Sequence, residues 1–196
     1  VRFIGNRSSG KMGHAIALAF ADQGAEVKII TGPTCIETNH KNISVIKVER
    51  ANEMHAECLK VYADTDIVVM SAAVADFAPV SAEKQKIKKE HELKQIELKP
   101  TVDILAELGD KKLDGQILVG FALETDNETA NARKKMSQKN LDIIVLNSLK
   151  DTGAGFGYDT NKVTILAKGM DDLFFDLKSK DEVALDLLEV INKIGK

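Results

Sequence analysis

The sequence predicts an α/β protein with a doubly wound, mostly parallel, Rossmann-like sheet. Short apolar runs that are typical of buried strands alternate along the chain with amphipathic stretches of about ten to fifteen residues. Parallel sheets with helical crossovers require this alternation. Glycines and small polar residues also gather just after the apolar runs, where such sheets bind their ligands. We expect a single domain over residues 1–196.

The composition is that of an ordinary globular protein. The 196 residues are 44% hydrophobic and 29% charged, with a net charge of −3, which argues against a surface that coats nucleic acid. No apolar run approaches the roughly 18 residues that cross a bilayer, so we expect no membrane association. Cys35 and Cys58 lie far apart with no metal-ligand spacing. Two reduced thiols are typical of a cytoplasmic protein.

The first half of the chain contains most of the predicted crossovers. Gly24 is a natural stop for the first helix. The uninterrupted apolar run at 66–74 indicates a strand buried on both faces. The predicted elements are strands at 1–4, 26–33, 42–49 and 66–74, with helices at 11–25 and 51–66.

The second half repeats the pattern and ends differently. Two apolar strands, at 116–123 and 142–147, enclose a polar helix at 127–140. Residues 162–167 and 173–177 predict a hairpin around Gly169, and Ser179 followed by Glu182 predicts the capping box of a last helix. The lysine-rich stretch at 81–100 has few residues to bury, so we expect an arm or flap outside the sheet.

The turn "GNRSSGKM" at 5–12 resembles a phosphate-binding P-loop in part. Gly5, Gly10 and Lys11 have the right spacing, but Met12 stands where a Ser or Thr would hold magnesium. Serines and backbone N–H groups at a helix start attract anions, and they equally serve as an ordinary serine-capped start. The dinucleotide fingerprint is also incomplete, because Gly10 and Gly13 lack its first glycine.

Asp76 and two groups of lysines each allow both a functional and an ordinary interpretation. Asp76, beyond the 66–74 strand, is placed to meet a ribose hydroxyl or a metal ion, or to cap a turn. Lys135 and Lys139 share a helical face and, with the lysines at 84–89, could clamp a triphosphate or form a solvated surface. The residues alone indicate a phosphorylated, nucleotide-like ligand and no particular reaction.

Seven motifs in order resemble the phosphopantothenate–cysteine ligase (phosphopantothenoylcysteine synthetase) family over nearly the whole chain. They are "VRFIGNRSSGKMG", "SAAVADF", "KIKK", "PTVDIL", "VGFALET", "KKMSQKN" and "GFGYDTN". In many bacteria this enzyme is the C-terminal half of a bifunctional coenzyme A biosynthesis protein. The resemblance therefore implies that the chain is fused to or associated with a flavin-dependent decarboxylase. It also implies a homodimer.

The resemblance also implies a two-step reaction. The carboxylate of 4′-phosphopantothenate attacks the α-phosphate of CTP, in the presence of Mg2+, and releases pyrophosphate. The amine of cysteine then displaces CMP from the acyl-cytidylate. Such chemistry needs charge stabilisation more than proton transfer, which suits a site rich in lysines and backbone N–H groups.

Site residues carry over by their positions in the motifs. Asn6 matches the asparagine that holds the acyl intermediate, and Lys86 matches the flap lysine needed to form it. Arg2, Ser8 and Ala73 match phosphopantothenate contacts, with the arginine supplied across a dimer interface. The nucleotide contacts match Met70, Ser71, Ala72, Asp76 (also a candidate for the metal), Lys86, Val102, Asp103, Ile104, Leu105, Phe121, Lys135 and Lys139.

Two departures from the family pattern leave alternatives open. We expect an upstream strand and a glycine-rich turn, roughly T-x-G-G-T-x-E, that this sequence does not include. Pro100 also stands two residues earlier than in the "NPDI" form of some members, and the residues do not decide between CTP and ATP. The alternatives are an NAD(P)-dependent oxidoreductase of the Rossmann type and a non-catalytic nucleotide-binding module.

Overall fold

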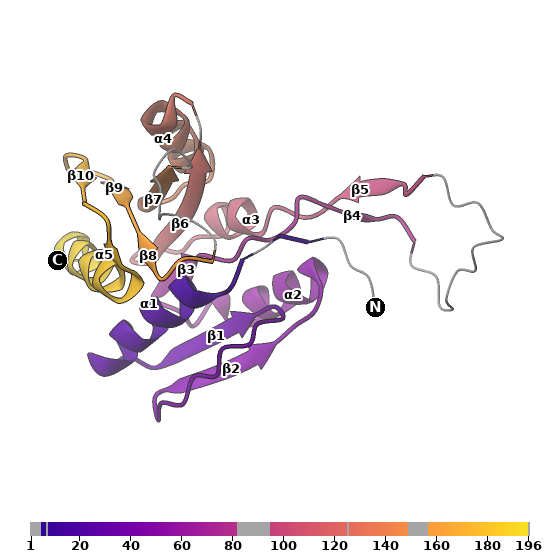
Figure 1. The fold of residues 1–196 in the computed structure, drawn as a ribbon, viewed down its shortest axis with the longest axis horizontal. Helices are drawn as coiled ribbons and strands as arrows, with labels where there is room; N and C mark the ends of the chain where they lie inside the picture. Colours follow the sequence, from indigo (N-terminus) through magenta and orange to yellow (C-terminus); the bar gives the residue numbers. More distant parts are fainter. Residues whose placement is uncertain (1–4, 7, 82–94, 125, 149–156, 196) are drawn as a thin grey trace.

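The computed structural model describes residues 5–6, 8–81, 95–124, 126–148 and 157–195 (Figure 1). The helices are α1 (Lys11–Asp22), α2 (Ala51–Tyr62), α3 (Ile104–Asp110), α4 (Glu128–Gln138) and α5 (Lys180–Ile194). The strands are β1 (Val27–Thr31), β2 (Ile43–Lys47), β3 (Ile67–Met70), β4 (Phe77–Pro79), β5 (Leu98–Pro100), β6 (Ile117–Glu124), β7 (Ile143–Ser148), β8 (Thr160–Asn161), β9 (Val163–Ala167), β10 (Leu173–Phe174) and β11 (Lys178–Ser179).

A five-stranded mixed sheet forms the centre, in the order β10-β9-β7-β6-β3. Strands β3, β6 and β7 run parallel, with Met70 of β3 opposite Gly120 of β6. The predicted late hairpin is confirmed, because β9 lies antiparallel to both β7 and β10. Strands β1 and β2 form a parallel pair of their own, joined to the rest by packing.

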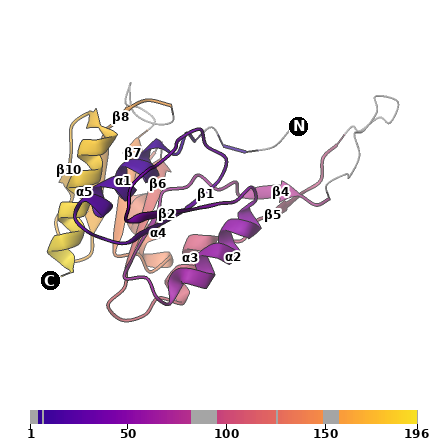
Figure 2. The same ribbon diagram turned by 90° about the horizontal axis from the view of Figure 1, so that it is seen from below.

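Helices cover both faces of the sheet, as the predicted doubly wound fold requires (Figures 1 and 2). One core cluster joins α1 and α5 to alternate residues of the strands, among them Val119, Val145 and Ile165. The other joins α2, α3 and α4 to the intervening residues, among them Leu118 and Ile144. Alternate residues of a strand point to opposite faces, so the continuous apolar runs of β6 and β7 supply both cores.

The strand expected over 66–74 is shorter than predicted. Strand β3 ends at Met70, and each of its residues is only half-buried, because β3 is an edge strand of the five-stranded sheet. Helix α3 was not predicted, since seven residues are too few for a clear periodicity. Asp103 caps it by accepting a hydrogen bond from the Ala106 N–H at 3.0 Å. The strand expected at 1–4 lies outside the described residues.

The helix ends follow the sequence in one case and depart from it in another. The capping box of α5 is confirmed, with the Glu182 N–H donating to the Ser179 hydroxyl oxygen at 3.2 Å. The N-cap of α1 is Gly10 in the left-handed conformation, at φ 79°, and no side chain caps this helix. The serine-capped start considered above is therefore wrong. Gly24, at φ 93°, follows the end of α1 as predicted.

An arm leaves the domain where the lysine-rich stretch was predicted to do so. Strands β4 and β5 pair antiparallel, with Phe77 opposite Pro100, and extend away from both cores (Figures 1 and 2). Residues 82–94, which include the "KIKK" motif, lie outside the described residues. Where it is described, the stretch forms a two-stranded sheet separate from the central one.

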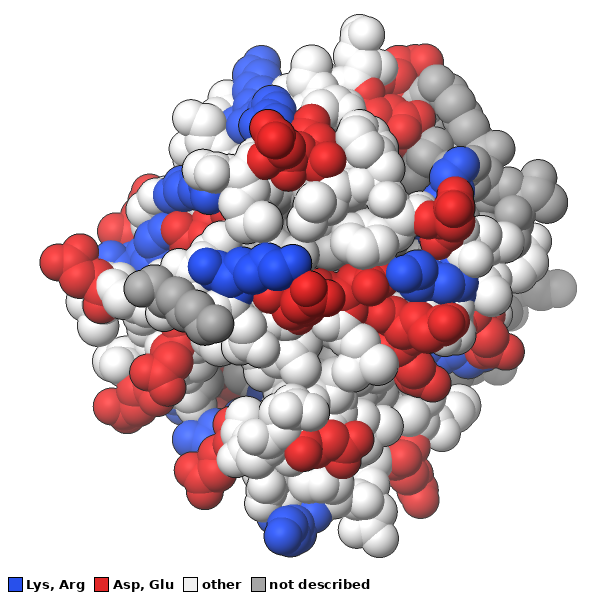
Figure 3. All heavy atoms as spheres, turned by 90° about the vertical axis from the view of Figure 1, so that its left-hand side faces the viewer, with Lys and Arg blue, Asp and Glu red and all other residues white. Residues whose placement is uncertain are grey.

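The exterior is mixed in charge on the face that Figure 3 presents, which carries acidic and basic side chains interspersed and no extended basic area. This agrees with the net charge of −3 and gives no electrostatic footprint for nucleic acid on that face. Among the described residues, no helix is both long and apolar enough to span a membrane.

Candidate active site at the carboxyl ends of the strands

The carboxyl ends of β3 and β6 bring several predicted residues together. Met70 ends β3 beside Gly120, and a side chain at Gly120 would come within 2.9 Å of Leu105 Cδ2. Met70 and Leu105 both pack against the core on the face covered by α2, α3 and α4. Phe121, one residue further along β6, packs against the opposite core with α1 and α5. The predicted nucleotide residues therefore occupy both faces of β6.

The turn at 5–10 meets the segment that follows β3. The side-chain amide of Asn6 donates to the Ala73 carbonyl oxygen at 2.9 Å and lies 3.4 Å from that of Val74. Gly13, in the first turn of α1, sits so close to Ser71 that a β-carbon there would be 2.9 Å from its hydroxyl oxygen. The structure thus joins the Asn6 turn to the predicted base-binding segment.

A second contact joins that segment to the start of α3. The Thr101 N–H donates to the Asp76 carbonyl oxygen at 2.9 Å, and the Thr101 hydroxyl donates to the Ala75 carbonyl oxygen at 2.7 Å. Asp76 and Val102 are both exposed on this edge. Ile104, in contrast, is buried in the core, so only its backbone can contact a ligand.

The remaining neutral candidates lie on the same connections. Ala72 is exposed, while Ser8 and Ala73 are half-buried. Ser8 precedes an α1 first turn that no side chain caps, so the hydroxyl and the N–H groups beside it form a polar corner of the kind that binds anions.

The two lysines of the predicted phosphate clamp are each paired with a carboxylate. Lys135 Nζ lies 2.6 Å from Glu124 Oε1, and Lys139 Nζ lies 2.7 Å from Asp103 Oδ2. Partial burial would raise the pKa of Asp103, but the hydrogen bonds from Lys139 and the Ala106 N–H and the charges of Lys139 and Lys135 outweigh it and lower that pKa. Asp103 therefore remains an anion at neutral pH.

Another charge cluster lies where α1 and α5 begin. Lys11 forms an ion pair with Asp159, and its hydrogen bond and charge lower the pKa of that carboxyl. Lys180 is buried and donates to the Tyr158 carbonyl oxygen. Burial, followed by repulsion from Lys11, lowers the pKa of Lys180, with Asp159 opposing. These contacts hold the residues at 157–161 against both helices.

The first turns of α1 also contain a buried histidine. His14 Nδ1 contacts the Thr38 hydroxyl in the connection between β1 and β2. Burial lowers the pKa of His14, so its ring is neutral at neutral pH and serves to pack the turn. Met12 packs against the core that α1 and α5 share, so it is a packing residue of the helix.

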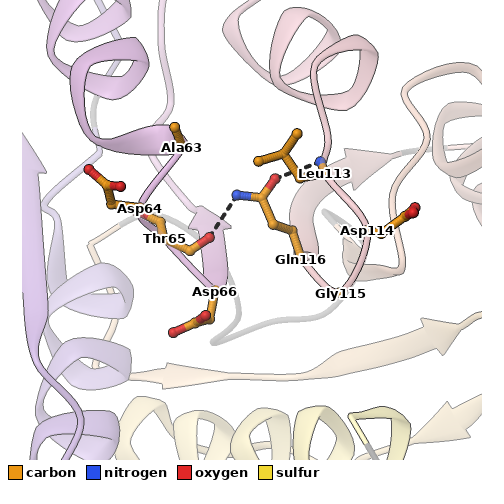
Figure 4. Close-up of a pocket in the computed structure, with 8 residues that line it drawn as sticks. All are labelled: Ala63, Asp64, Thr65, Asp66, Leu113, Asp114, Gly115 and Gln116. Carbon is orange, nitrogen blue, oxygen red and sulfur yellow. Dashed lines mark hydrogen bonds between the residues drawn. The ribbon is translucent and has the colours of Figure 1, made fainter.

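A hollow at the opposite edge of the sheet is structural (Figure 4). It has a volume of about 420 Å³ and lies between the residues that precede β3 and those that precede β6. Gln116 crosses it, donating to the carbonyl oxygens of Tyr62 at 2.8 Å and Thr65 at 2.7 Å and accepting from the Leu113 N–H at 2.8 Å. Each polar group of this side chain has a partner, so Gln116 ties the two loops together.

The structure leaves two predicted site residues undescribed and adds three residues that the sequence did not predict. Arg2 and Lys86 lie outside the described residues. Glu124, Thr101 and Asp159 also take part in these contacts, although the sequence did not predict a role for them. Only Glu124 had a local signal, since it ends the apolar run of β6 on the predicted ligand edge.

Comparisons with known proteins agree over the length of the chain. A family model described as the DNA/pantothenate metabolism flavoprotein C-terminal domain matches residues 1–194. The coenzyme A biosynthesis bifunctional protein CoaBC of Bacillus subtilis is 46% identical over 196 residues, which are 100% of this chain and 48% of that protein. A protein named cysteine/cysteine sulfinic acid decarboxylase, from an unknown prokaryotic organism, is 50% identical over 191 residues, covering 97% of this chain and 53% of its own.

A solved structure agrees as well. The crystal structure of the C-terminal domain of a coenzyme A biosynthesis bifunctional protein CoaBC superposes with a TM-score of 0.82 at 38% identity, covering 99% of this chain and 87% of that one. The chain spans about half the length of the curated relatives it matches. With its sequence matched from end to end and its fold shared, the chain belongs to the family of DNA/pantothenate metabolism flavoprotein C-terminal domains.

Proposed function

We propose that this chain is a phosphopantothenate–cysteine ligase domain of coenzyme A synthesis. The observation that carries the proposal is the 46% identity, along the whole chain, to the C-terminal half of a bifunctional protein named for that pathway. The polar edge formed by Asn6, the 71–76 segment and the lysines near the end of α4 supports it, because the reaction consumes two polyanionic substrates.

The first step is an attack by the carboxylate oxygen of 4′-phosphopantothenate on the α-phosphorus of CTP. The bond from this phosphorus to the bridging oxygen breaks, and pyrophosphate leaves with its electron pair. Lysine side chains offset the charge that accumulates on the phosphate oxygens. Lys135 and Lys139 pair with carboxylates near the end of β6 and the start of α3, and Lys86, outside the described residues, is the third candidate.

The second step is an attack by the neutral amine of cysteine on the acyl carbon. CMP leaves, the amine loses a proton to solvent, and the amide remains. Asn6 suits the acyl group because an amide donates and accepts hydrogen bonds without titrating. Its Nδ2 now faces the Ala73 and Val74 carbonyl oxygens, close to where the acyl group would bind.

Magnesium fits this site as a companion of the triphosphate. Among the described residues, no group of three or more His, Cys, Asp or Glu side chains converges as a metal site. Asp76 supplies one exposed carboxylate, and triphosphate oxygens are the usual additional ligands of this ion. When bound, the ion would neutralise phosphate charge; Asp76 would hold it beside the segment after β3.

A homodimer is part of the proposal, and the arm supports it. A two-stranded sheet is marginal by itself, and this one exposes apolar side chains, 54% of Phe77 and 45% of Leu98, with 60% of Ile96 exposed just before β5. Exposed apolar patches mark protein interfaces. The role proposed for Arg2, supplied by a partner copy, also requires a dimer. Sedimentation of the Phe77→Lys variant, expected as a monomer, tests this interface.

The activity test uses the full natural protein with CTP, 4′-phosphopantothenate and cysteine. We expect CMP and pyrophosphate to be released in equal amounts, and only when 4′-phosphopantothenate is present. Replacing CTP by ATP, UTP or GTP in the same assay identifies the base preference. Consumption of CTP that does not depend on either organic substrate would contradict the proposal.

The same material separates the alternatives. Binding of CTP without turnover would favour a nucleotide-binding module, and tight binding of NAD(P)H would favour an oxidoreductase. Fusion to a flavin-dependent decarboxylase is a further part of the proposal, because the chain matches about half of each curated relative. A cytoplasmic location is also part of the proposal, as the two reduced thiols predict. Flavin absorbance of the purified natural protein tests the fusion.

A further inference from the structure

Two carboxylates hold the predicted phosphate-binding lysines from outside their helix. Glu124, the last residue of β6, pairs with Lys135 at 2.6 Å, and Asp103, the N-cap of α3, pairs with Lys139 at 2.7 Å. Positive and negative groups from three elements therefore meet at one edge of the sheet. Before a nucleotide binds, the carboxylates therefore offset the charges of Lys135 and Lys139 and fix their positions.

The Glu124 pair is the more restricted of the two. The Glu124 side chain is only 12% exposed, whereas that of Lys135 is 46% exposed. The Asn131 side-chain amide also donates to Glu124 Oε2, at 3.3 Å. A carboxylate that is so nearly buried needs a cation beside it. The nearly buried Glu124 carboxylate therefore holds the Lys135 ammonium group on the protein side, while about half of the lysine side chain is exposed to solvent.

Lysine chemistry allows such an anchor to assist a ligand. In the described part of the chain, Glu124 Oε1 is buried and accepts no hydrogen bond, so its 2.6 Å contact with Lys135 is an ion pair. An ammonium group has three N–H donors, so Lys135 can stay beside Glu124 and still direct N–H groups to phosphate oxygens. Lysine also has a flexible four-carbon stem that loses rotamer freedom when it binds an anion. A lysine held in place beforehand loses less of that freedom on binding.

We propose that Glu124 is a positioning residue for nucleotide binding, which holds the Lys135 ammonium group at the carboxyl edge of the sheet for the polyphosphate of the nucleotide. The inference rests on the proposed function, because it needs a nucleoside triphosphate at this edge. The opposite effect is also conceivable physically: Glu124 would compete with phosphate for Lys135 and repel it. The two effects have opposite signs, so measurement separates them.

The experiment compares four variants of the full natural protein, by the KM and Kd for CTP and by kcat. Glu124→Gln keeps the shape and removes the charge, so we expect the KM and Kd for CTP to rise on the order of tenfold, with kcat within about twofold. Glu124→Asp, which keeps the charge, should recover part of this loss. Lys135→Met should weaken CTP binding at least as much, and adding Glu124→Gln to it should cause no further loss.

The matched control lies on the same helix. Arg133 of α4 forms an ion pair with Asp172, whose side chain is 20% exposed. Asp172→Asn therefore removes a comparable carboxylate from a cation on α4, away from the proposed contacts. We expect its KM for CTP to stay within about twofold of the wild type. A general loosening of α4 would instead change the KM in both variants.

Each outcome decides the assignment. An unchanged or lowered KM in Glu124→Gln overturns it, as do losses that multiply in the Glu124→Gln/Lys135→Met double variant. An equal rise in Asp172→Asn overturns it as well. If the wild type turns over and Glu124→Gln has the same KM for CTP, only the role of Glu124 is rejected. If the wild-type protein binds no CTP, the proposed function is rejected together with that role.

Discussion

The side-chain amide of Asn6 donates a hydrogen bond to the backbone carbonyl oxygen of Ala73, 67 positions further along the chain, over 2.9 Å. This contact joins the turn before α1 to the segment after β3. It directs the Asn6 side chain toward the edge where the strands end. The fold therefore fixes the position of the amide to which we assign the acyl intermediate.

An Asn6→Asp variant should separate the two proposed steps. A carboxylate at this position faces two carbonyl oxygens and has no donor for them, and it would repel a developing oxyanion. We expect one round of pyrophosphate release and accumulation of the acyl-cytidylate, with amide formation slowed by on the order of 100-fold. Rapid quenching followed by chromatography measures both products.

The matched variant for that experiment is Lys86→Gln, at the position assigned to formation of the intermediate. It should release no pyrophosphate even with both organic substrates present. Ordinary turnover in either variant would reject the role assigned to that residue. Accumulation of the same intermediate in both variants would show that the assignment of steps is wrong.

Gly109 of α3 is a packing requirement beneath the candidate site. A β-carbon there would lie 2.0 Å from the Lys139 carbonyl oxygen, and backbone cannot move aside as a side chain can. We expect Gly109→Ala to lower the free energy of unfolding by about 3 kcal/mol and to raise the KM for CTP, because α3 carries Asp103. Urea denaturation and kinetics measure the two effects.

Gly32 offers a control for the Gly109 experiment. A β-carbon at Gly32 would meet no atom within 4 Å, so Gly32→Ala should change the free energy of unfolding by less than about 0.5 kcal/mol. A Gly109→Ala variant as stable as Gly32→Ala would contradict the close packing of α3 against the segment after α4.

Asp142 should make the stability depend on pH in the acid range. Burial would raise its pKa, but hydrogen bonds from Lys112, at 2.8 Å, and from the Leu118 N–H outweigh burial and lower it. A carboxyl with a lowered pKa stabilises the fold above its unfolded pKa of about 3.9 and loses this contribution as the pH falls through the folded value. Asp142→Asn should cost about 2–3 kcal/mol at neutral pH.

The difference between Asp142→Asn and the wild type should shrink as the pH falls below about 4. Denaturation curves at a series of pH values measure it. Glu189→Gln provides the comparison, because Glu189 pairs with Lys193 on the exposed side of α5 and such pairs contribute little. A pH-independent cost of Asp142→Asn would mean that the Asp142 charge is not what stabilises the fold.

His14 should produce a separate, weaker dependence near pH 6. Burial lowers its pKa, so the folded state binds the proton less readily than the unfolded state does. Its contribution is complete above the unfolded pKa of about 6.5 and declines as the pH falls below that value. His14→Phe keeps a planar ring without the charge and should flatten the stability curve between about pH 7 and pH 5. An unaltered slope would contradict this role.

Much of the fold was predictable because local patterns specify it. The continuous apolar runs of β6 and β7, the helical spacing in α1 and the Ser179 capping box each depend on neighbours within a few positions, where periodicity and capping act. The elements at the margins were harder to predict. Strand β3 lies at an edge of its sheet and is only half-buried, and α3 is too short to produce a periodic pattern.

The sequence by itself determined the residue types at the carboxyl edge: an asparagine, lysines and small residues after apolar strands. Only the tertiary structure decided which of them meet. Whether Lys135 contacts Glu124, and Asn6 contacts Ala73, depends on strand order, on register and on the side to which each crossover passes. These are set by how two hydrophobic cores close on one sheet, and no local pattern within the chain encodes the outcome.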